Sequence, residues 1–237
     1  MKKNLYIYHH LGIGDHIICN GIVNHCSEEY EKIFLFCKPS NLKNVSFLYR
    51  NNPKICLIPM NDDQVRFFMK VNTQNEYLVI GHTPEFFRKL DVEKSITFET
   101  GFYEMAKIPF SYKWEKFKIE RDTEAEMAAC KKTGLSLGEK YVFVHDDISR
   151  KFTIKNKYLS KDLRIIRPSD YPNIGIFDFF TIIQNAKEIH VINSSFSALI
   201  DCFGIESSNM FYHKYARTDM GSNGEQTLRP IWKILNE

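Results

Sequence analysis

The stretch that decides the fold is residues 5–16, LYIYHHLGIGDH. The apolar residues 5–9 predict a strand, the glycines permit a tight turn, and a helix is predicted from Asp15 to about Cys26. A strand, a glycine loop and a helix in this order predict the first crossover unit of a parallel sheet.

The same alternation of strand and helix patterns continues along the chain. A charged stretch at 114–122 leads into a predicted helix at 123–133 and separates two series of units. We therefore predict an α/β fold of two compact Rossmann-like domains, residues 1–125 and 126–237, with parallel sheets facing a ligand-binding cleft. A last helix is predicted from about Pro230. The other strands are predicted at 33–37, 54–58, 77–80, 141–145, 163–166, 188–192 and 209–212.

Composition excludes several classes of protein. The chain has 237 residues, of which 43% are hydrophobic and 14% aromatic, so it can bury a large core and is not disordered. A net charge of +3 is too small to indicate a nucleic-acid partner. No apolar run is long enough for a transmembrane segment, and no signal peptide precedes the first strand, so we expect a cytoplasmic protein. The six cysteines form no CxxC pair and are expected to be reduced thiols.

The glycine loop is the first candidate site. Gly12 and Gly14 would let the backbone approach a ligand, and Asp15 at the head of the next helix has two interpretations, a helix cap or a general base. The loop lacks the third glycine of a dinucleotide fingerprint. Lys38 also stands where a ribose-binding acid would be expected.

The second candidate site follows the predicted strand at 141–145. His145 ends this strand, and Arg150 and Lys151 follow it closely enough to neutralise a diphosphate. Asp146 and Asp147 are adjacent on an extended chain and point to opposite faces, so no metal site is predicted.

The third candidate site is the turn Asn193-Ser194-Ser195-Phe196-Ser197. It joins an apolar strand to an apolar helix. The first amides of this helix, with the hydroxyls of Ser194, Ser195 and Ser197, suit a phosphate. The alternative is an ordinary N-cap with nothing bound.

These motifs resemble those of GT-B type glycosyltransferases. Leu11–Ile18 resembles the Gly-Asp loop of the family 9 heptosyltransferases. Phe143–Phe152 loosely resembles the His-x-Arg-Arg-Gly-Asp loop of the α-1,2 and α-1,6 fucosyltransferases, and Asn193–Ser197 more closely resembles the Asn-Ser-Ser-Phe-Ser turn of the α-1,2 enzymes.

The resemblance implies a glycosyltransferase of polysaccharide biosynthesis. It would move a sugar from a nucleotide-diphosphate sugar to a glycan or glycolipid hydroxyl, with inversion and with neither metal nor cofactor. Residues 1–125 would then be the acceptor side and 126–237 the sugar-nucleotide side, with a peripheral membrane contact left open. Asp15 would be the catalytic base. The implied nucleotide-sugar-binding residues are Gly12, Gly14, His16, His145, Arg150, Lys151, Asn193, Ser194, Ser195 and Ser197.

Three alternatives stay open from the sequence. In the first, the chain is a non-catalytic nucleotide or sugar-phosphate binding module, and Asp15 only caps a helix. The second is an NAD-dependent oxidoreductase that uses the glycine turn, which the missing third glycine disfavours. The third is an interaction domain that exposes the charged stretch at 114–126.

Overall fold

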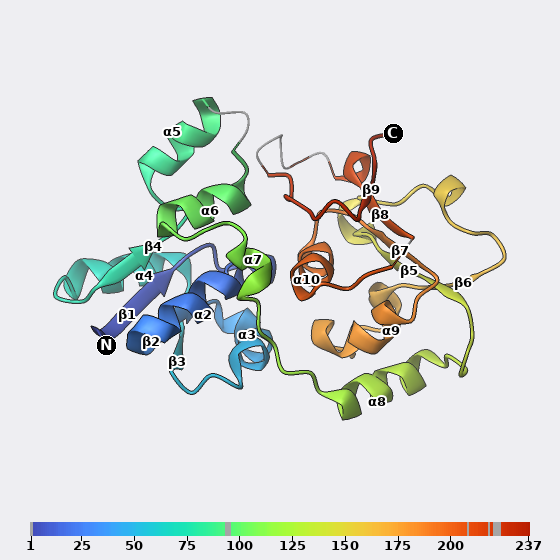
Figure 1. Cartoon of the computed structure of the whole chain (residues 1–237), viewed down its shortest axis with the longest axis horizontal. Coiled ribbons are helices and arrows are strands. Elements are labelled where there is room, and N and C mark those ends of the chain that lie inside the picture. Colours follow the sequence, from blue (N-terminus) through green and yellow to red (C-terminus); the bar gives the residue numbers. More distant parts are fainter. Residues whose placement is uncertain (1, 93–95, 208, 218, 220–223) are drawn as a thin grey trace. The chain divides into compact units, whose positions relative to one another are not determined.

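The computed structural model describes residues 2–92, 96–207, 209–217, 219 and 224–237. Its chain divides into two compact units. Unit 1 comprises Met1–Glu120 and Ser222–Thr227, and unit 2 comprises Arg121–Gly221 and Leu228–Glu237 (Figure 1). Their first junction lies between residues 120 and 121, five residues before the junction predicted from the sequence.

A four-stranded parallel sheet forms the centre of unit 1. Its strand order is β3-β2-β1-β4, so β1 is flanked on both sides. The strands are β1 (Lys2–Tyr8), β2 (Tyr30–Cys37), β3 (Ile55–Pro59) and β4 (Tyr77–Val79).

Helices cover this sheet because both of its faces are apolar. Tyr8 and Phe36 pack with Val65 of the fourth helix on one face, while Ile7 and Leu35 are fully buried on the other. The helices are α1 (Ile13–Ile18), α2 (Asn20–Glu29), α3 (Leu42–Tyr49), α4 (Asp62–Val71), α5 (Pro84–Val92), α6 (Phe98–Ala106) and α7 (Tyr112–Glu115).

Unit 2 contains a five-stranded parallel sheet of order β6-β5-β7-β8-β9. Its strands are β5 (Tyr141–His145), β6 (Arg164–Ile166), β7 (Glu188–Val191), β8 (Met210–His213) and β9 (Lys233–Leu235). Its α-helices are α8 (Thr123–Thr133), α9 (Phe180–Gln184) and α10 (Ser195–Phe203). Short 3-10 turns lie at 148–150, 156–158, 168–170, 176–179 and 214–216 in unit 2, and one lies at 39–41 in unit 1.

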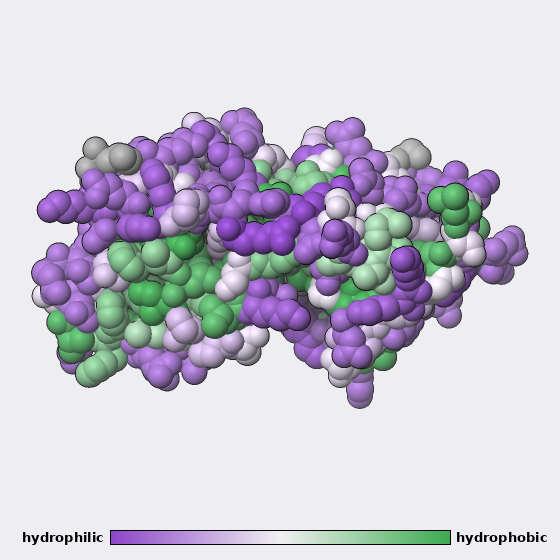
Figure 2. Space-filling view, turned by 90° about the horizontal axis from the view of Figure 1, so that it is seen from below, coloured by the Kyte–Doolittle hydropathy of each residue, from purple (hydrophilic) through white to green (hydrophobic). Residues whose placement is uncertain are grey.

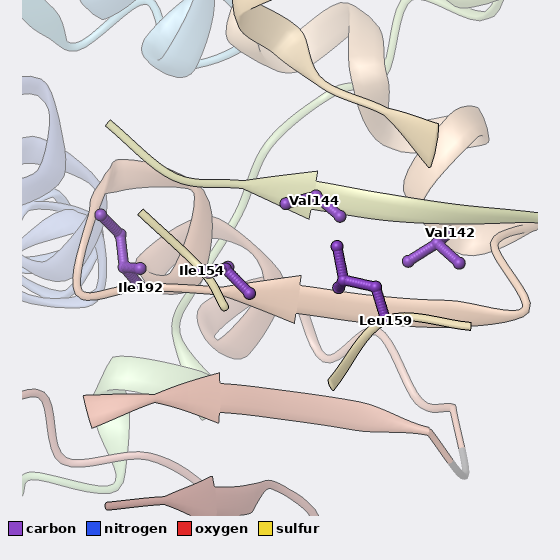
Figure 3. Packing of buried hydrophobic residues seen from close by; sticks show 5 residues of the cluster. All are labelled: Val142, Val144, Ile154, Leu159 and Ile192. Carbon is purple, nitrogen blue, oxygen red and sulfur yellow. The ribbon is translucent and has the colours of Figure 1, made fainter. Parts of the chain in front are cut away.

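One core cluster of unit 2 is built without an α-helix. Val142 and Val144 of β5 pack with Ile192, and with Ile154 and Leu159 from the irregular segment between β5 and β6 (Figure 3). All five side chains are at most 6% exposed. The segment after β5 is therefore fastened to the sheet, which fixes the loop that leaves the carboxyl end of β5.

The predicted α/β class with two parallel sheets is confirmed, and three predicted elements differ in detail. The helix predicted over 15–26 starts earlier and is interrupted at Cys19 between α1 and α2. The apolar spacing of residues 177–185 predicts a single helix, whereas the structure has a 3-10 turn there, followed by the short α9. The terminal helix predicted from Pro230 is wrong, because these residues form the edge strand β9, with Ile234 paired to Tyr212.

Asp201 explains why the C-terminal segment leaves the helical path. This fully buried carboxylate accepts hydrogen bonds from the Arg229 amide and from Trp232 Nε1, both at 3.0 Å. These two bonds hold residues 229–232 against α10, and β9 follows directly. Among the described residues, no helix has the length and apolar character needed to cross a membrane.

Candidate functional site

The first candidate site lies at the carboxyl edge of the unit 1 sheet, where β1 ends. Gly12 is the N-cap of α1, with an extended backbone (φ −72°, ψ 151°), and the structure shows no side-chain cap hydrogen bond there. A Cβ on Gly12 would lie 2.6 Å from Oδ2 of Asp15, so a larger residue at this position would displace the carboxylate. Gly14 is the second residue of α1.

Asp15 is the third residue of α1 and is half-buried. Burial raises the pKa of its carboxyl to about 6, and the charge of Glu99 adds to this effect. His10 and the backbone amides of Asp15 and Gly12 act in the opposite direction. A carboxyl group with a pKa near neutrality can accept a proton at physiological pH, as a general base must.

Two histidines at the sheet edge surround the loop. His10 Nε2 lies 2.8 Å from the carbonyl oxygen of Gly81, just beyond β4, and its ring is 4.7 Å from that of His82. The His10 ring also contacts Phe98 and Phe102 of α6, at 5.7 and 5.2 Å between centroids. The loop is thus held between β4 and α6.

His16 lies apart from this edge, in the core. Its side chain is fully buried and its ring is 4.4 Å from that of His9, edge to face. Burial lowers the pKa of both histidines, to about 4 for His9 and well below the ordinary value for His16. Both rings are therefore neutral at physiological pH, and His16 packs within unit 1 although it neighbours Asp15 in sequence.

The second candidate site is the loop after β5 in unit 2. Asp147 accepts hydrogen bonds from Ser149 Oγ at 2.6 Å, from Arg150 Nε at 2.6 Å and from the Arg150 amide at 3.1 Å. These hydrogen bonds lower the pKa of Asp147 to about 2, Ser149 contributing most. Arg150 remains half exposed over the Phe152 ring, and Lys151 adopts a left-handed backbone (φ 64°).

Asp146 points inward, away from Asp147's partners. It is 8% exposed, its Oδ2 accepts from the Ile154 amide at 3.3 Å, and its Oδ1 lies 3.6 Å from Arg167 Nε. The carboxylate therefore anchors the loop to the core cluster and to Arg167 at the end of β6. The two adjacent aspartates have separate partners, as the extended-chain argument predicts.

His145 connects this loop with the third candidate site. Its ring is half-buried and lies 4.4 Å from the Phe196 ring at the start of α10. Burial lowers the pKa of His145 to about 4, so the imidazole is neutral. Within the described part of the chain, its Nδ1 is buried without a hydrogen-bond partner.

The third candidate site is the first turn of α10. Ser194 Oγ accepts from the Ser197 amide at 3.3 Å, and Ser197 Oγ accepts from the Ser194 amide at 2.9 Å. These reciprocal bonds form a capping box, so both hydroxyls predicted to bind phosphate also stabilise the helix. The amides of Ser195 and Phe196 and the Ser195 hydroxyl have no partner among the residues that the structure describes.

A cation missed by the sequence analysis lies at this turn. Arg217 follows β8, and its Nη1 donates to the Asn193 carbonyl oxygen at 2.7 Å. Its guanidinium carbon is 6.0 Å from the centre of the Phe152 ring, over which Arg150 also lies at 5.4 Å. Arg217 is not recognisable from the sequence because its position depends on the strand order β5-β7-β8, which makes the end of β8 a neighbour of the end of β7.

The structure therefore brings several predicted residues together within unit 2. His145, Arg150, Asn193, Ser194 and Ser195 lie at one sheet edge and are connected by shared contacts with Phe196, Phe152 and Arg217. Free amides, a neutral imidazole and two guanidinium groups form an arrangement that can bind an anion with two phosphate groups.

Comparison at the level of sequence gives no match, neither to a family model nor to a curated protein. Two solved structures are similar in fold. The glycosyltransferase family 9 protein from Veillonella parvula DSM 2008 has a TM-score of 0.60 and 9% identity, over 99% of this chain and 85% of that chain. ADP-heptose LPS heptosyltransferase II from E. coli has a TM-score of 0.56 and 9% identity, over 99% of this chain and 90% of that chain. The predicted resemblance to family 9 is confirmed for the fold, and the chain has the GT-B type fold of these glycosyltransferases.

Proposed function

We propose that the protein is a glycosyltransferase that moves a sugar from a nucleoside-diphosphate sugar to a hydroxyl group of a glycan or glycolipid, with inversion. The observation that carries the proposal is Asp15, a half-buried carboxyl beyond the central strand of a GT-B type fold, with a pKa raised to about 6. The carboxyl also accepts a hydrogen bond from the backbone of Gly12, the N-cap of α1, but such a capping role needs no raised pKa.

The reaction is a single displacement. Asp15 accepts the proton of the acceptor hydroxyl as its oxygen forms a bond to the anomeric carbon, through an oxocarbenium-like state. The bond from this carbon to the diphosphate oxygen breaks on the opposite face, and the electron pair leaves with the nucleoside diphosphate. The proton on Asp15 then passes to solvent.

The leaving diphosphate gains negative charge as this bond breaks. The free amides of Ser195 and Phe196 and the positive end of α10 suit it, as do the guanidinium groups of Arg150 and Arg217. Neutral His145 has a free ring nitrogen for a sugar or phosphate oxygen. Gly12 keeps the space around the carboxylate open, whereas buried His16 has a packing role in this proposal.

The test is Asp15→Asn, assayed for sugar transfer and separately for binding of the donor. The amide cannot accept the proton, so transfer should fall by about 10²- to 10⁴-fold while donor binding is retained. Asp63→Asn is the control, because the Asp63 side chain is 98% exposed on α4. If transfer survives Asp15→Asn, the assignment of the base is wrong. If the chain binds nucleotide sugars but transfers to no hydroxyl acceptor, the non-catalytic binding module replaces this proposal.

A further inference from the structure

A hollow of about 790 Å³ lies at the amino edge of the unit 2 sheet. Its walls include the last turns of α8, the turn that leads into β5, and the segments that lead into β7 and β8. The loop after β5 and the turn at 193–197 lie at the carboxyl edge, at the other end of the same strands. A surface bound at the hollow would therefore leave the candidate donor residues of unit 2 accessible.

Leu137 stands at the tip of a well-fixed turn beside this hollow. The Ser136 amide donates to Glu139 Oε2 at 2.9 Å, and the Glu139 amide donates to the Ser136 carbonyl oxygen at 3.1 Å. Gly138 has a left-handed backbone (φ 76°), as the third residue of a type II turn does. The Leu137 side chain is 106% exposed, so it packs against nothing in the fold. A polar residue would fit the same backbone, and the turn itself gives no reason for leucine.

The acidic group of this turn is already paired. Glu139 Oε1 lies 3.5 Å from Nη1 of Arg164, which also donates to the Gly134 carbonyl oxygen at 3.0 Å. Of the described residues that line the hollow, Glu139 alone is acidic. Because Arg164 compensates its charge, Glu139 does not neutralise the cations around the hollow.

These cations are Lys131, Lys140 and Lys187, which all line the hollow. Lys131 lies in the last turn of α8, while Lys140 and Lys187 each precede one of the paired strands β5 and β7. The Lys187 amide donates to the Tyr141 carbonyl oxygen at 2.9 Å, which places the two strand starts side by side. All three lysines are exposed, and none has an ion-pair partner within the part of the chain that the structure describes.

We propose that this basic hollow, defined by Met127, Lys131, Leu137, Lys140 and Lys187, binds the surface of a bilayer that contains anionic phospholipids. Exposed apolar side chains are ordinary when they are scattered, but Leu137 and Met127, which is 53% exposed, gather at one hollow. Leucine at the tip enters the hydrocarbon. The lysines, whose long stems let the ammonium groups reach outward, contact the lipid phosphates.

The chemistry of the hollow favours a bilayer over a protein partner. A protein would need an apolar pocket for Leu137 with acidic groups placed opposite each lysine. An anionic bilayer offers hydrocarbon beneath a continuous layer of phosphates, so it satisfies both requirements in any orientation about the tip. The inference goes beyond the proposed function and does not depend on it.

The test is co-sedimentation of the full-length protein with lipid vesicles. We expect binding to vesicles of equal parts phosphatidylcholine and phosphatidylglycerol, and little binding to phosphatidylcholine alone. About 1 M salt should remove the binding, because it shortens the Debye length to about 3 Å. The triple variant Lys131→Gln, Lys140→Gln, Lys187→Gln should weaken the binding by about fivefold for each lysine replaced.

The matched control replaces three exposed lysines of unit 1 and makes the same change in net charge. This triple variant, Lys43→Gln, Lys70→Gln, Lys107→Gln, should bind the mixed vesicles like the wild-type protein.

Leu137→Ser tests the apolar tip separately. It should weaken binding to the mixed vesicles by about tenfold or more, since the leucine no longer leaves water. Val71→Ser is its control, because Val71 is also exposed, at 58%, but lies on α4 of unit 1. All the replaced side chains are exposed, so the variants should keep the wild-type thermal midpoint. A Leu137→Trp variant should show an emission shift to shorter wavelength with the mixed vesicles and none with phosphatidylcholine.

Several results would overturn the inference. They are an absence of binding to the mixed vesicles, an unchanged affinity in Leu137→Ser, and an equal loss in the two lysine triple variants. Light scattering that shows a dimer which Leu137→Ser dissociates would make a second copy of the chain the occupant instead. Because no readout involves sugar transfer, a failed transferase assay leaves this inference standing, and failed vesicle binding leaves the proposed function standing.

Discussion

Replacing Asp15 by asparagine is expected to stabilise unit 1 at neutral and alkaline pH. The pKa of this carboxyl is about 6 in the folded protein, against 3.8 for an ordinary aspartate. Because the pKa is higher in the folded protein, folding favours the protonated carboxyl. The contribution of this group to the free energy of unfolding is fully present below pH 3.8 and is lost as the pH rises through 6. Ionisation of Asp15 therefore costs about 3 kcal/mol of folding free energy at pH 8.

Asparagine is neutral at every pH and avoids this cost. Asp15→Asn should therefore raise the free energy of unfolding by about 3 kcal/mol at pH 8, but by only about 1 kcal/mol at pH 4.5, where the folded carboxyl is already protonated. If the carboxylate only stabilised the start of α1, Asp15→Asn would instead lower the free energy of unfolding, because removing a charge from a first helical turn costs about 0.3–1 kcal/mol. The sign of the change thus distinguishes the two interpretations of Asp15.

Urea unfolding followed by tryptophan fluorescence measures this difference. The chain has two tryptophans, and a Trp232→Phe background leaves Trp114 of α7 as a reporter of unit 1 alone. Asp63→Asn is the control, because Asp63 also lies in the first turn of a unit 1 helix, α4, but its side chain is 98% exposed. Since a charge in a first helical turn stabilises the helix by about 0.3–1 kcal/mol, this variant should lose no more stability than that at pH 8. A loss of stability in Asp15→Asn at pH 8, or a gain independent of pH, would refute the reasoning.

Three further expectations concern stability. Gly21→Ala should destabilise unit 1 by about 2 kcal/mol or more in urea unfolding, because the added Cβ would lie 2.0 Å from the Tyr112 carbonyl oxygen. An unchanged or higher free energy of unfolding would contradict this packing. Ser194→Ala should lower the stability of unit 2 by about 1 kcal/mol through loss of the capping box, and an unchanged urea midpoint would exclude that role. Burial lowers the pKa of His213 to about 3, with a smaller contribution from the charge of His190. The pKa of His213 is lower in the folded protein than the 6.5 of the unfolded chain. Its contribution to the free energy of unfolding is therefore fully present above pH 6.5 and falls on acidification, by about 2 kcal/mol at pH 5. His213→Gln should remove this part of the pH dependence, and an equally steep dependence in the variant would refute the assignment.

The sequence predicts most of the fold because its signals are local. Each parallel strand is a short apolar run, and the end of α8 at Gly134 follows from the left-handed C-cap (φ 67°) that glycine favours. The end of the chain is different. Residues 233–235 form a strand only because Trp232 bonds to Asp201 and Ile234 pairs with β8, and neither contact is visible in the local pattern.

The candidate site shows the same limit. Asp15 and the turn at 193–197 are recognisable as motifs, since a glycine loop and a serine-rich helix start have local signatures. Arg217 has no motif. It gains a role from strand order, which places it beside Asn193. Burial, which sets the proton affinity of Asp15 and His145, is likewise a property of the folded chain.

The central claim is that this chain binds a nucleoside-diphosphate sugar. A thermal-shift panel of GDP-, UDP-, ADP- and CMP-sugars on the full-length protein tests it most directly. We expect at least one of the three diphosphate sugars, at about 100 times its dissociation constant, to raise Tm by about 5 °C or more. The monophosphate CMP-sugar should give a smaller shift, because it presents one phosphate fewer to Arg150, Arg217 and the first turn of α10. A flat response to all four sugars would contradict the account.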